Sequence, residues 1–522
     1  MKQKTKYMSV LEKFMKIVEV GGNKLPHPLV LFTYLTIFIL ILSFILAKLN
    51  VSVTYLTTSK EGLKEVTVNA YNLLSKEFFR TFVKDFVNIY IGFFPIGLVV
   101  VMMFGVSVAE KSGLISALMK KLVFGAPDYL VTFIVAIVGI CANLASDAGI
   151  VFAPAIGGAV FFALGRHPFA GIMAGYVAAY GGFSANLLIA GTDALLAGIT
   201  QSIISGFTSE PVNIHPLMNW FVMASSTIML AAVVTIVTEK IITPILGKFD
   251  PADETLKVPS KEELTLTETE NKGLKAVGIT TIIFILGLFI LSYPKNAFFR
   301  NASGNLLPTS PLTQGLMFII FLYFMLIGYF YGKVTKTITS GKDIAKFMQS
   351  GLEGVSGFLI VCLPASMFIH FFTKSNISTL IGVGGAHFVE RMDISGIPLV
   401  IMLILLTAFM NLFISSGSSK WLIIGPIFVP MFYMLGIHPA TTQMAYRIGD
   451  STTNIISPVS AYIPVILGMM EKYRSKNQEL GIGSVLSLTI PYSVILLVIW
   501  IIFFTIWLLI GLPMGPGTPA FL

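Results

Sequence analysis

The sequence has little charge and almost no cysteine. Of its 522 residues only 12% are charged and two are cysteines, whereas 55% are hydrophobic. A water-soluble domain cannot bury that much apolar surface, and several apolar runs reach the roughly 20 residues that span a bilayer. We therefore predict an all-α polytopic membrane protein. The two cysteines, Cys141 and Cys362, lie in apolar segments without metal-ligand spacing, which favours two small buried hydrophobic residues.

Several motifs are also missing. The sequence contains no G-x-x-x-x-G-K-[ST] nucleotide loop, no serine-hydrolase elbow and no H-E-x-x-H zinc motif. An ATP-driven protein and an enzyme are therefore both disfavoured. The formal net charge is +9, but the basic residues cluster within 2–24, 111–121, 333–346 and 472–476. All four clusters lie on one side of the predicted topology, which is the positive-inside bias of a multi-pass protein of the inner (cytoplasmic) membrane and no sign of a nucleic-acid partner. The N-terminus is expected in the cytoplasm.

A set of short motifs occurs twice, half a chain apart. Asn-Leu-x4-Gly is found at 143–149 and 411–417, and Leu-Gly-x-His-Pro at 164–168 and 435–439. Lys-Ser-Gly at 111–113 matches Lys-Ser-Asn at 374–376. The spacing within each motif is the same in both copies. Two related halves with polar residues inside apolar segments are typical of transporters built from an internal repeat.

Hydropathy predicts nine transmembrane helices and two re-entrant hairpins. The crossings are expected at 28–48, 88–109, 170–206, 217–245, 274–294, 314–333, 351–372, 440–471 and 484–511. The stretches 128–164 and 397–436 are too long for one span and break in the middle, so each is predicted to enter and leave on the same side. An odd number of crossings separates the hairpins, so the internal repeat is predicted to be inverted.

The chain divides accordingly. A cytoplasmic segment, 1–27, precedes a first half, 28–245, with hairpin 128–164 and broken helix 170–206. A cytoplasmic linker, 246–273, leads to a second half, 274–511, with hairpin 397–436 and broken helix 440–471. The tail is 512–522. Polar outer loops are expected at 49–87 and 295–313, and neither is large enough to be an enzyme domain.

Both hairpin tips and both broken helices carry small polar residues. The helix breaks are expected at 181–193 and 447–458. Unwound backbone with Asn, Ser and Asp oxygens suits a sodium ion, although any single such residue is explained equally well by helix packing. The expected ion-coupling residues are Asn143, Ser146, Asp147, Asn186, Asp193, Asn411, Ser415, Ser418, Asp450 and Asn454. Sodium is expected near Asn143, Asn186, Asn411 and Asn454, with no other cofactor.

Ionisable residues at membrane depth stand out because a charge at the bilayer centre costs about 3 kcal/mol. Arg447 and Asp450 lie three residues apart on one helix face. They form either a structural ion pair or a site where Arg447 receives a substrate carboxylate while Asp450 titrates. Asp193 has no basic neighbour in sequence, so we expect it to be unpaired and to carry a proton or accept a substrate N–H.

Three further residues are candidates for the substrate site. Trp421 follows the second hairpin tip, where an aromatic platform for a flat ligand is favoured over the interfacial belt. Pro458 is expected to free backbone groups where it interrupts a helix. Pro439 either does the same or simply begins a helix at its first turn.

The segments that carry these motifs resemble the AbgT family of p-aminobenzoyl-glutamate transporters, along essentially the whole chain. The resemblance rests on Leu25-Pro26-His27-Pro28, Gly191-Thr192-Asp193, Ser415-Ser416-Gly417-Ser418 with Trp421, and 446–454. It implies a dimeric carrier with nine transmembrane helices and two hairpins. It also implies that Asp193, Trp421, Pro439, Arg447, Asp450 and Pro458 match the family's functional positions.

The resemblance further implies the cargo: p-aminobenzoyl-glutamate, sulfonamide antimetabolites, or both. We therefore expect a secondary active transporter, either antiporter or symporter, that is driven by a proton or sodium gradient, lies in the lipid bilayer and forms a homodimer. The alternative is a sodium-coupled carrier of dicarboxylates or amino acids with the same fold. An ion channel or intramembrane enzyme is a third class, and the missing nucleophile constellation disfavours the enzyme.

Overall fold

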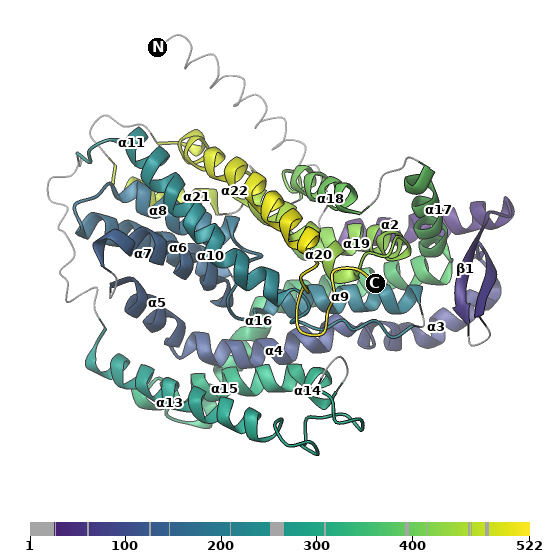
Figure 1. Ribbon diagram of the computed structural model, residues 1–522, viewed down its shortest axis with the longest axis horizontal. Helices are drawn as coiled ribbons and strands as arrows, with labels where there is room; N and C mark the ends of the chain where they lie inside the picture. The colour runs from purple at the N-terminus through teal and green to yellow at the C-terminus, as the bar shows by residue number, and fades with distance from the viewer. Residues whose placement is uncertain are drawn as a thin grey trace, which may run out of the picture.

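The chain is mostly helical (Figure 1). The computed structural model describes residues 26, 28–59, 62–124, 127–145, 147–208, 210–250, 266–306, 310–391, 396–414, 416–457, 460, 462–474 and 480–522. The first half contains α2 (Pro28–Lys48), α3 (Lys76–Ile91), α4 (Phe94–Lys111), α5 (Leu114–Phe124), α6 (Val131–Cys141), α7 (Asp147–Ala163), α8 (Pro168–Tyr176), α9 (Gly191–Phe207), α10 (Trp220–Val237) and α11 (Thr243–Leu246). Short 3-10 turns, η1 (Asp128–Leu130) and η2 (Ala142–Ala145), and π-helical turns, η3 (Val177–Gly181) and η4 (Thr238–Ile242), lie between them.

The second half begins with α13 (Glu268–Ile290). It continues with α14 (Pro311–Gln314), α15 (Leu316–Thr335), α16 (Gly341–Lys374), α17 (Ile377–Arg391), α18 (Ile397–Met410), α19 (Gly417–Met434), α20 (Pro439–Asn454), α21 (Ile463–Glu471) and α22 (Ile482–Ile510). The tips between α6 and α7 and between α18 and α19 fall where the sequence predicted interruptions.

Seven helical stretches within the described residues are long and apolar enough to cross a membrane. They are Pro28–Lys48, Lys76–Lys111, Trp220–Leu246, Glu268–Ile290, Leu316–Thr335, Val355–Lys374 and Ile482–Ile510. The helix pairs α8–α9 and α20–α21 are absent from this set because each is interrupted. The long helices expose large apolar side chains, such as Ile283 of α13 and Val494 of α22. Lipid, rather than water, suits such a surface.

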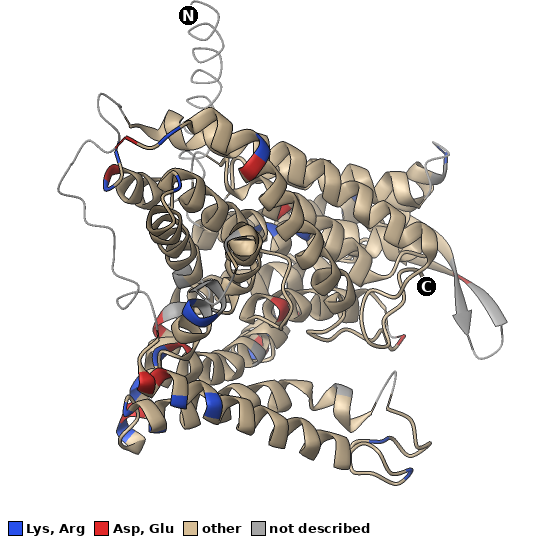
Figure 2. Cartoon of the chain, turned by 60° about the vertical axis from the view of Figure 1, so that its left-hand side comes forward, with Lys and Arg blue, Asp and Glu red and all other residues tan. Residues whose placement is uncertain are grey.

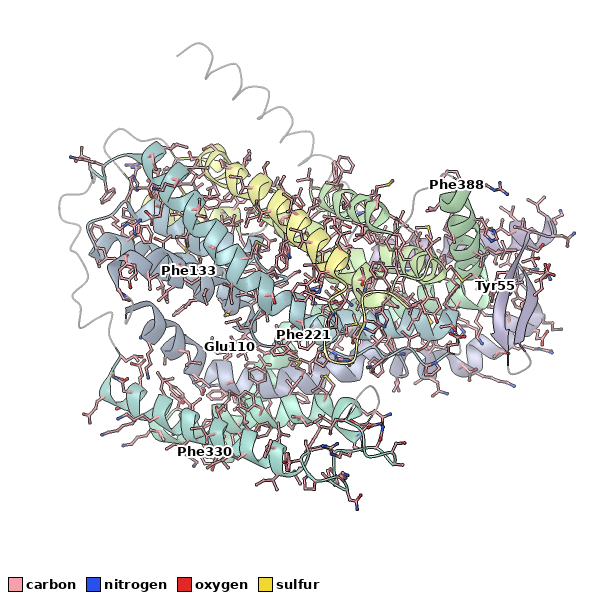
Figure 3. The ribbon with its side chains drawn as sticks, in the orientation of Figure 1. Tyr55, Glu110, Phe133, Phe221, Phe330 and Phe388 are labelled. Atoms are coloured by element: carbon pink, nitrogen blue, oxygen red, sulfur yellow. The ribbon has the colours of Figure 1, made fainter. Side chains whose placement is uncertain are left out.

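Charge is confined mainly to the ends of helices, while the helical body is almost free of it (Figure 2). A few charged segments nevertheless lie inside the bundle in the same view. Aromatic side chains such as Phe330 of α15 and Phe388 of α17 lie at the periphery (Figure 3). The charges in the interior are therefore exceptions, and their partners decide what the site can do.

The expectation of a polar loop at 49–87, and of an all-α chain, is wrong in one place. Strand β1 (Ser52–Ser59) pairs antiparallel with β2 (Gly62–Asn69), and Tyr55 lies opposite Val66. The alternating Val, Thr and Tyr residues of this segment favour a strand, so the signal was present in the sequence. The helix that follows also begins earlier than predicted. α3 starts at Lys76 and is joined to α4 through Gly92 and Phe93.

The crossing predicted at 351–372 is part of a longer helix. α16 has 34 residues and packs along α2, α3 and α4. Its contact with α3 is aromatic, because the ring of Phe371 lies 5.2 Å from Phe78 and 5.0 Å from Phe82, edge to face. At its start, hydrogen bonds from the Thr339 hydroxyl and then from the Thr339 and Ser340 backbone lower the pKa of the Asp343 carboxyl to about 2.

The repeated Leu-Gly-x-His-Pro motif joins α7 to α8 in the first half and α19 to α20 in the second. Gly436 has φ +76°, a left-handed conformation that favours glycine, and Gly165 has φ +68° in the first copy. Ile437 N donates to Phe432 O at 2.9 Å, the bond that closes a Schellman cap at the end of α19. The glycine thus ends one helix so that the next can begin three residues later.

The histidine and proline of the motif start that next helix. His438 Nδ1 accepts a hydrogen bond from Ala440 N at 3.1 Å, and His167 Nδ1 does the same from Phe169 N at 3.3 Å. Pro439 lies in the first turn of α20. The prediction that Pro439 begins a helix is confirmed, since proline lacks an N–H that would be unpaired there.

The tail packs against the two halves rather than extending away from them. Met514 is fully buried, and its carbonyl accepts a hydrogen bond from Phe221 N at 3.1 Å near the start of α10. Ala520 O accepts from His438 N at 3.2 Å and from Thr441 Oγ1 at 2.7 Å. The tail therefore ties the beginning of α10 to the beginning of α20.

Candidate functional site

An ion pair joins the broken helices of the two halves. Arg447 Nη2 on α20 lies 2.5 Å from Asp193 Oδ1 on α9, and both side chains are buried. Asp193 also accepts a hydrogen bond from Ala190 N at 2.7 Å, which places its carboxylate over the start of α9. The positive end of a helix stabilises a negative charge at that position. The expectation that Asp193 is unpaired is therefore wrong, because its partner is 254 residues away in the chain.

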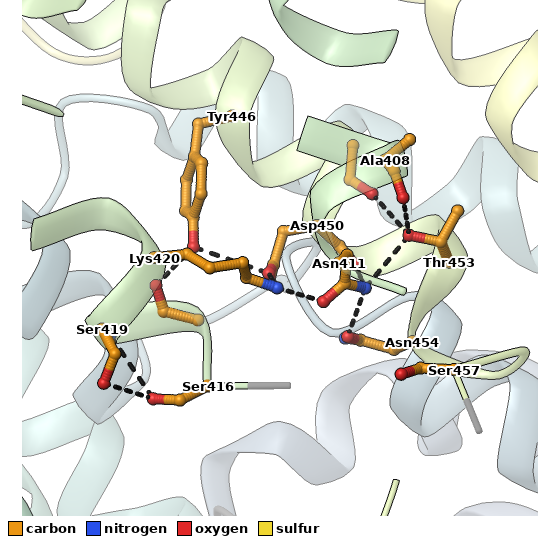
Figure 4. Close-up of polar contacts among 12 residues, drawn as sticks. Ala408, Asn411, Ser416, Ser419, Lys420, Tyr446, Asp450, Thr453, Asn454 and Ser457 are labelled. Atoms are coloured by element: carbon orange, nitrogen blue, oxygen red, sulfur yellow. Dashed lines mark hydrogen bonds and ion pairs between the residues drawn. The ribbon is translucent and has the colours of Figure 1, made fainter. Parts of the chain in front are cut away.

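A second ion pair lies within the second half. Lys420 Nζ on α19 lies 2.5 Å from Asp450 Oδ1 on α20, and the lysine side chain is fully buried (Figure 4). Asp450 thus pairs with Lys420 rather than with Arg447, its predicted neighbour on the helix face. Gly417 begins α19 beside this carboxylate, and a Cβ on Gly417 would lie 3.2 Å from Asp450 Oδ2. The glycine lets the carboxylate approach the helix start.

Asn411 at the second tip connects this pair to the first half. Its Oδ1 accepts a hydrogen bond from Lys420 Nζ, and its Nδ2 donates to the backbone oxygen of Asp450 at 2.5 Å and to Asn454 Oδ1 at 2.9 Å. Asn454 Nδ2 in turn donates to Tyr180 O at 3.2 Å, in the π-helical turn η3. The second tip, α20 and the first helix break therefore meet in one network. Figure 4 shows the part of this network at the second tip and α20.

Trp421 belongs to a neighbouring buried network that also crosses between the halves. Its Nε1 donates to Thr200 Oγ1 on α9 at 3.0 Å, and Gln443 Nε2 on α20 donates to the same oxygen at 2.7 Å. Asn219 Nδ2 completes the chain with a 3.0 Å bond to Gln443 Oε1. The indole ring packs against the Tyr446 ring, with 4.7 Å between ring centroids and the two planes tilted by 36°. In this conformation Trp421 is fully buried.

The first tip differs from the second because its polar atoms are open. Asn143 Nδ2 donates to Ile140 O at 2.9 Å, whereas its buried Oδ1 has no hydrogen-bond partner among the described residues. Asn186 Oδ1 accepts from Leu188 N at 3.2 Å, and its buried Nδ2 has no partner in the described part of the chain. Since α6 packs against η3, this tip and this break are neighbours. Buried polar atoms normally find partners, so these two atoms are available to a water molecule or a ligand.

Arg447 also keeps an open donor. Within the residues that the structure describes, its buried Nε has no hydrogen-bond partner, although Nη2 is paired with Asp193. A guanidinium offers five N–H donors in a planar fork that matches a carboxylate. An acidic ligand that accepts from Nε would therefore complete the hydrogen bonding of a side chain that is already held in place.

A cavity of 740 Å³ follows one face of α9. Ala197, Gln201 and Ser205 line it at intervals of four residues, and Asp193 continues the same interval one turn earlier. Its other polar walls include His370 and Lys374 at the end of α16. The helix face that begins with the buried ion pair thus leads into a space large enough for a small molecule.

Some predicted residues are not part of the networks described above. Ser146, Ser415 and Pro458 lie outside the described residues, as does the side chain of Asp147. Ser418 is half-buried near the start of α19. The break predicted at 447–458 is wrong in its position: α20 is helical through Asn454 and the interruption follows it. Its polar residues therefore project from a regular helix and do not line unwound backbone.

Sequence reasoning missed five residues of the site. They are Thr200, Asn219, Lys420, Gln443 and Tyr446. A lysine within the apolar stretch 397–436 was a visible signal, because such a residue needs a partner at membrane depth. The others are uncharged and common in membrane helices, so the sequence alone gave no reason to choose them.

Two buried cations and two buried carboxylates give the site no net charge, and its residues come from both halves of the chain. Together with the apolar, lipid-suited surface, this arrangement defines a multi-pass membrane protein with a buried polar site. A model of the AbgT putative transporter family matches residues 13–522. The chain belongs to the AbgT family.

Relatives along nearly the whole chain agree. The p-aminobenzoyl-glutamate transport protein of Escherichia coli (strain K12) is 36% identical over 501 residues, which cover 96% of this chain and 95% of that protein. The YdaH transporter of Alcanivorax borkumensis, described as having an unusual topology, superposes with a TM-score of 0.85 at 33% identity, over 94% of this chain and 100% of that chain. MtrF of Neisseria gonorrhoeae is described within a class of antimetabolite efflux pumps. It superposes with a TM-score of 0.89 at 36% identity, over 97% of this chain and 100% of that chain.

Proposed function

We propose that the chain is a secondary active transporter of p-aminobenzoyl-glutamate, sulfonamide antimetabolites or both, driven by a proton or sodium gradient. The observation that carries the proposal is the buried Arg447–Asp193 pair with its open Nε donor. The relatives from Escherichia coli and Neisseria gonorrhoeae, whose names refer to this cargo, support it. Membrane transport itself follows from the family.

The chemistry of the cargo fits the residues of the site. Its glutamate carboxylates would accept hydrogen bonds from the Arg447 guanidinium, as charge-assisted bonds are the strong ones. Its aniline N–H, which sulfonamides share, would donate to Asp193. Its flat ring would stack on Trp421 in place of Tyr446, whose ring now covers that face. Pro439 would set the start of α20 and hence the position of Arg447, and Asp450 would hold Lys420 beside it.

Alternating access would use the two inverted halves. With nine crossings and two re-entrant hairpins, formed by α6–α7 and α18–α19, the two tips would lie opposite each other, as in other carriers with interrupted helices. The N-terminus would lie in the cytoplasm and the protein in the inner membrane as a homodimer. The cavity beside α9 would give the cargo its route from the outer side to Asp193.

Coupling would involve the open polar atoms of the first half. Asn143 Oδ1 is a buried acceptor without a partner, and oxygen ligands of this kind suit sodium. Asn186 lies at the neighbouring break. Asp193 and Asp450 are the acidic groups that a proton-coupled cycle would use, the first released when the cargo takes its place on Arg447.

The deciding experiment is flux of labelled p-aminobenzoyl-glutamate into proteoliposomes, with sodium and pH gradients imposed separately. D193N and R447K should abolish flux that the unmodified protein shows. E239Q serves as the matched control because Glu239 forms a peripheral pair with Arg166 at 2.5 Å. Retained flux in D193N and R447K would contradict the proposal. Competition by succinate but not by p-aminobenzoyl-glutamate would instead favour the sodium-coupled dicarboxylate or amino-acid carrier.

A further inference from the structure

The second tip holds a buried lysine at a position where the first half has an apolar residue. Lys420 is the fourth residue of α19, and its side chain has no exposed surface. Its ammonium group contacts one carboxylate oxygen, Asp450 Oδ1, and one amide oxygen, Asn411 Oδ1. A buried lysine is costly in a membrane protein, so its presence calls for a specific role.

The repeated motif supplies the comparison. Counted from the glycine of Asn-Leu-x4-Gly, Lys420 in the second half stands where Phe152 stands in the first. Asn411 and Asn143 are the equivalent asparagines. The Oδ1 atom of Asn411 is occupied by the lysine ammonium, whereas the Oδ1 atom of Asn143 is buried and has no partner. The asparagine oxygen of the second tip thus has a cationic partner, and the equivalent oxygen of the first tip has none among the described residues.

We propose that the Lys420 ammonium is a built-in cation that occupies, at the second tip, the place that a mobile coupling cation takes at the first. A carboxylate and an asparagine oxygen are the hard oxygen ligands that sodium prefers, and an ammonium with three donors can take both of them. The proposal rests on the proposed carrier function, and it assigns the ion specificity of the two tips. Each protomer then binds one coupling cation, at the tip that contains Asn143.

Charge balance supports the assignment. Asp450 and Lys420 neutralise each other, and Asn411 Nδ2 already donates to the Asp450 backbone and to Asn454. A sodium ion added here would introduce an unbalanced buried charge and would find both oxygens taken. Removing the lysine would leave the same two oxygens around a vacated space with one negative charge.

The test uses K420A in the full-length protein, with ammonium, methylammonium and sodium as probes. Thermal unfolding of the purified protein is the first measurement because it needs no transported substrate. K420A should have a lower melting temperature, and each added cation should raise it in proportion to its occupancy. The unmodified protein should not respond to ammonium. If K420A unfolds as the unmodified protein does and ignores all three cations, the proposal is overturned.

The double variant K420A/D450N separates charge from packing. It removes the lysine and also the charge left behind, so it should be more stable than K420A and should not respond to ammonium. This comparison holds even if K420A cannot be purified without added cation. Equal instability of the two variants would mean that Lys420 matters only as a space-filling side chain, and the proposal would be rejected.

Flux supplies a separate readout. Sodium activation of the unmodified carrier should follow a Hill coefficient of about 1, and that of K420A about 2, since the coefficient is limited by the number of sites. An unchanged Hill coefficient in K420A would count against the proposal that the Lys420 ammonium is a built-in cation. Absence of any flux in the unmodified protein would refute the proposed carrier function, while the unfolding measurements would still decide the role of Lys420.

Discussion

Arg447 Nη2 and Asp193 Oδ1 meet at 2.5 Å from helices in opposite halves of the chain, and each side chain is almost completely removed from the surface. The pair therefore does two things. It compensates two charges in an apolar interior, and it fixes the orientation of α20 relative to α9.

Neutralising Asp193 in this buried pair should lower the free energy of unfolding far more than neutralising Glu239 in a peripheral pair. In D193N the Arg447 guanidinium stays buried without its carboxylate, and breaking a buried pair in this way costs about 3–5 kcal/mol. E239Q breaks the pair with Arg166, whose side chains are 25% and 35% exposed, and such a pair contributes about 0–1 kcal/mol. Unfolding in detergent by denaturant titration measures both. Similar losses in the two variants would show that burial does not set the energy of the inner pair.

A methyl group at Gly417 should disturb the second ion pair. Its Cβ would lie 3.2 Å from Asp450 Oδ2 and 3.7 Å from the Tyr446 hydroxyl, so the carboxylate must shift. If the shift costs about 1.4 kcal/mol, substrate affinity of G417A falls about tenfold. Binding of labelled substrate to the purified protein checks this. G384A in α17 is the control because nothing lies within 4 Å of its added Cβ, and a comparable loss there would refute the explanation.

The Thr200 hydroxyl should contribute more to stability than an ordinary buried threonine hydroxyl does. It accepts hydrogen bonds from Trp421 Nε1 and Gln443 Nε2, so T200V leaves two buried donors unpaired. Each unpaired donor costs about 1–3 kcal/mol. T227V offers the same change at a fully buried threonine that bonds only to Met223 O in its own helix. Thermal unfolding should show a clearly larger loss for T200V, and equal losses would argue against a linking role.

Backbone strain can be measured at the end of the second hairpin. G436A places alanine at φ +76° in open space, which costs about 1–2 kcal/mol from conformation alone. G468A in α21 also meets nothing within 4 Å, but its backbone is helical, where alanine is favoured over glycine by about 1 kcal/mol. The two variants should therefore change the unfolding free energy in opposite directions. A stabilised G436A would show that the left-handed cap is not needed.

The sequence allowed the repeat, the interruptions and most of the apolar spans to be predicted because these depend on local patterns. The repeated Leu-Gly-x-His-Pro motif proved to be a helix end followed by a helix start, which its residue types already indicated. Partners that lie far apart in the chain could not be predicted. Asp193 looked unpaired and Asp450 looked paired with Arg447, because only neighbours in sequence were visible.

Two other differences have separate causes. Residues 49–87 are polar enough to suggest a loop, but the alternating Val, Thr and Tyr residues of strand β1 favour a strand, so this element was predictable from the sequence. The second helix interruption follows Asn454 rather than Arg447, because polar residues such as Asp450 and Asn454 do not by themselves unwind a helix. In α20 they lie on a regular helix, and polar neighbours satisfy them.

The π-helical turn η3 sets the position of a backbone carbonyl that joins the two halves of the chain, which no side-chain substitution can do. A π-turn contains a residue more than the corresponding α-helical turn, and here the widened turn presents the Tyr180 carbonyl to Asn454. The contact between η3 and α20 therefore depends on the number of residues in the turn and not on which residues they are. Relatives that gain or lose one residue at this point would have to rebuild the junction, so variation in length here should accompany a change in cargo or gating.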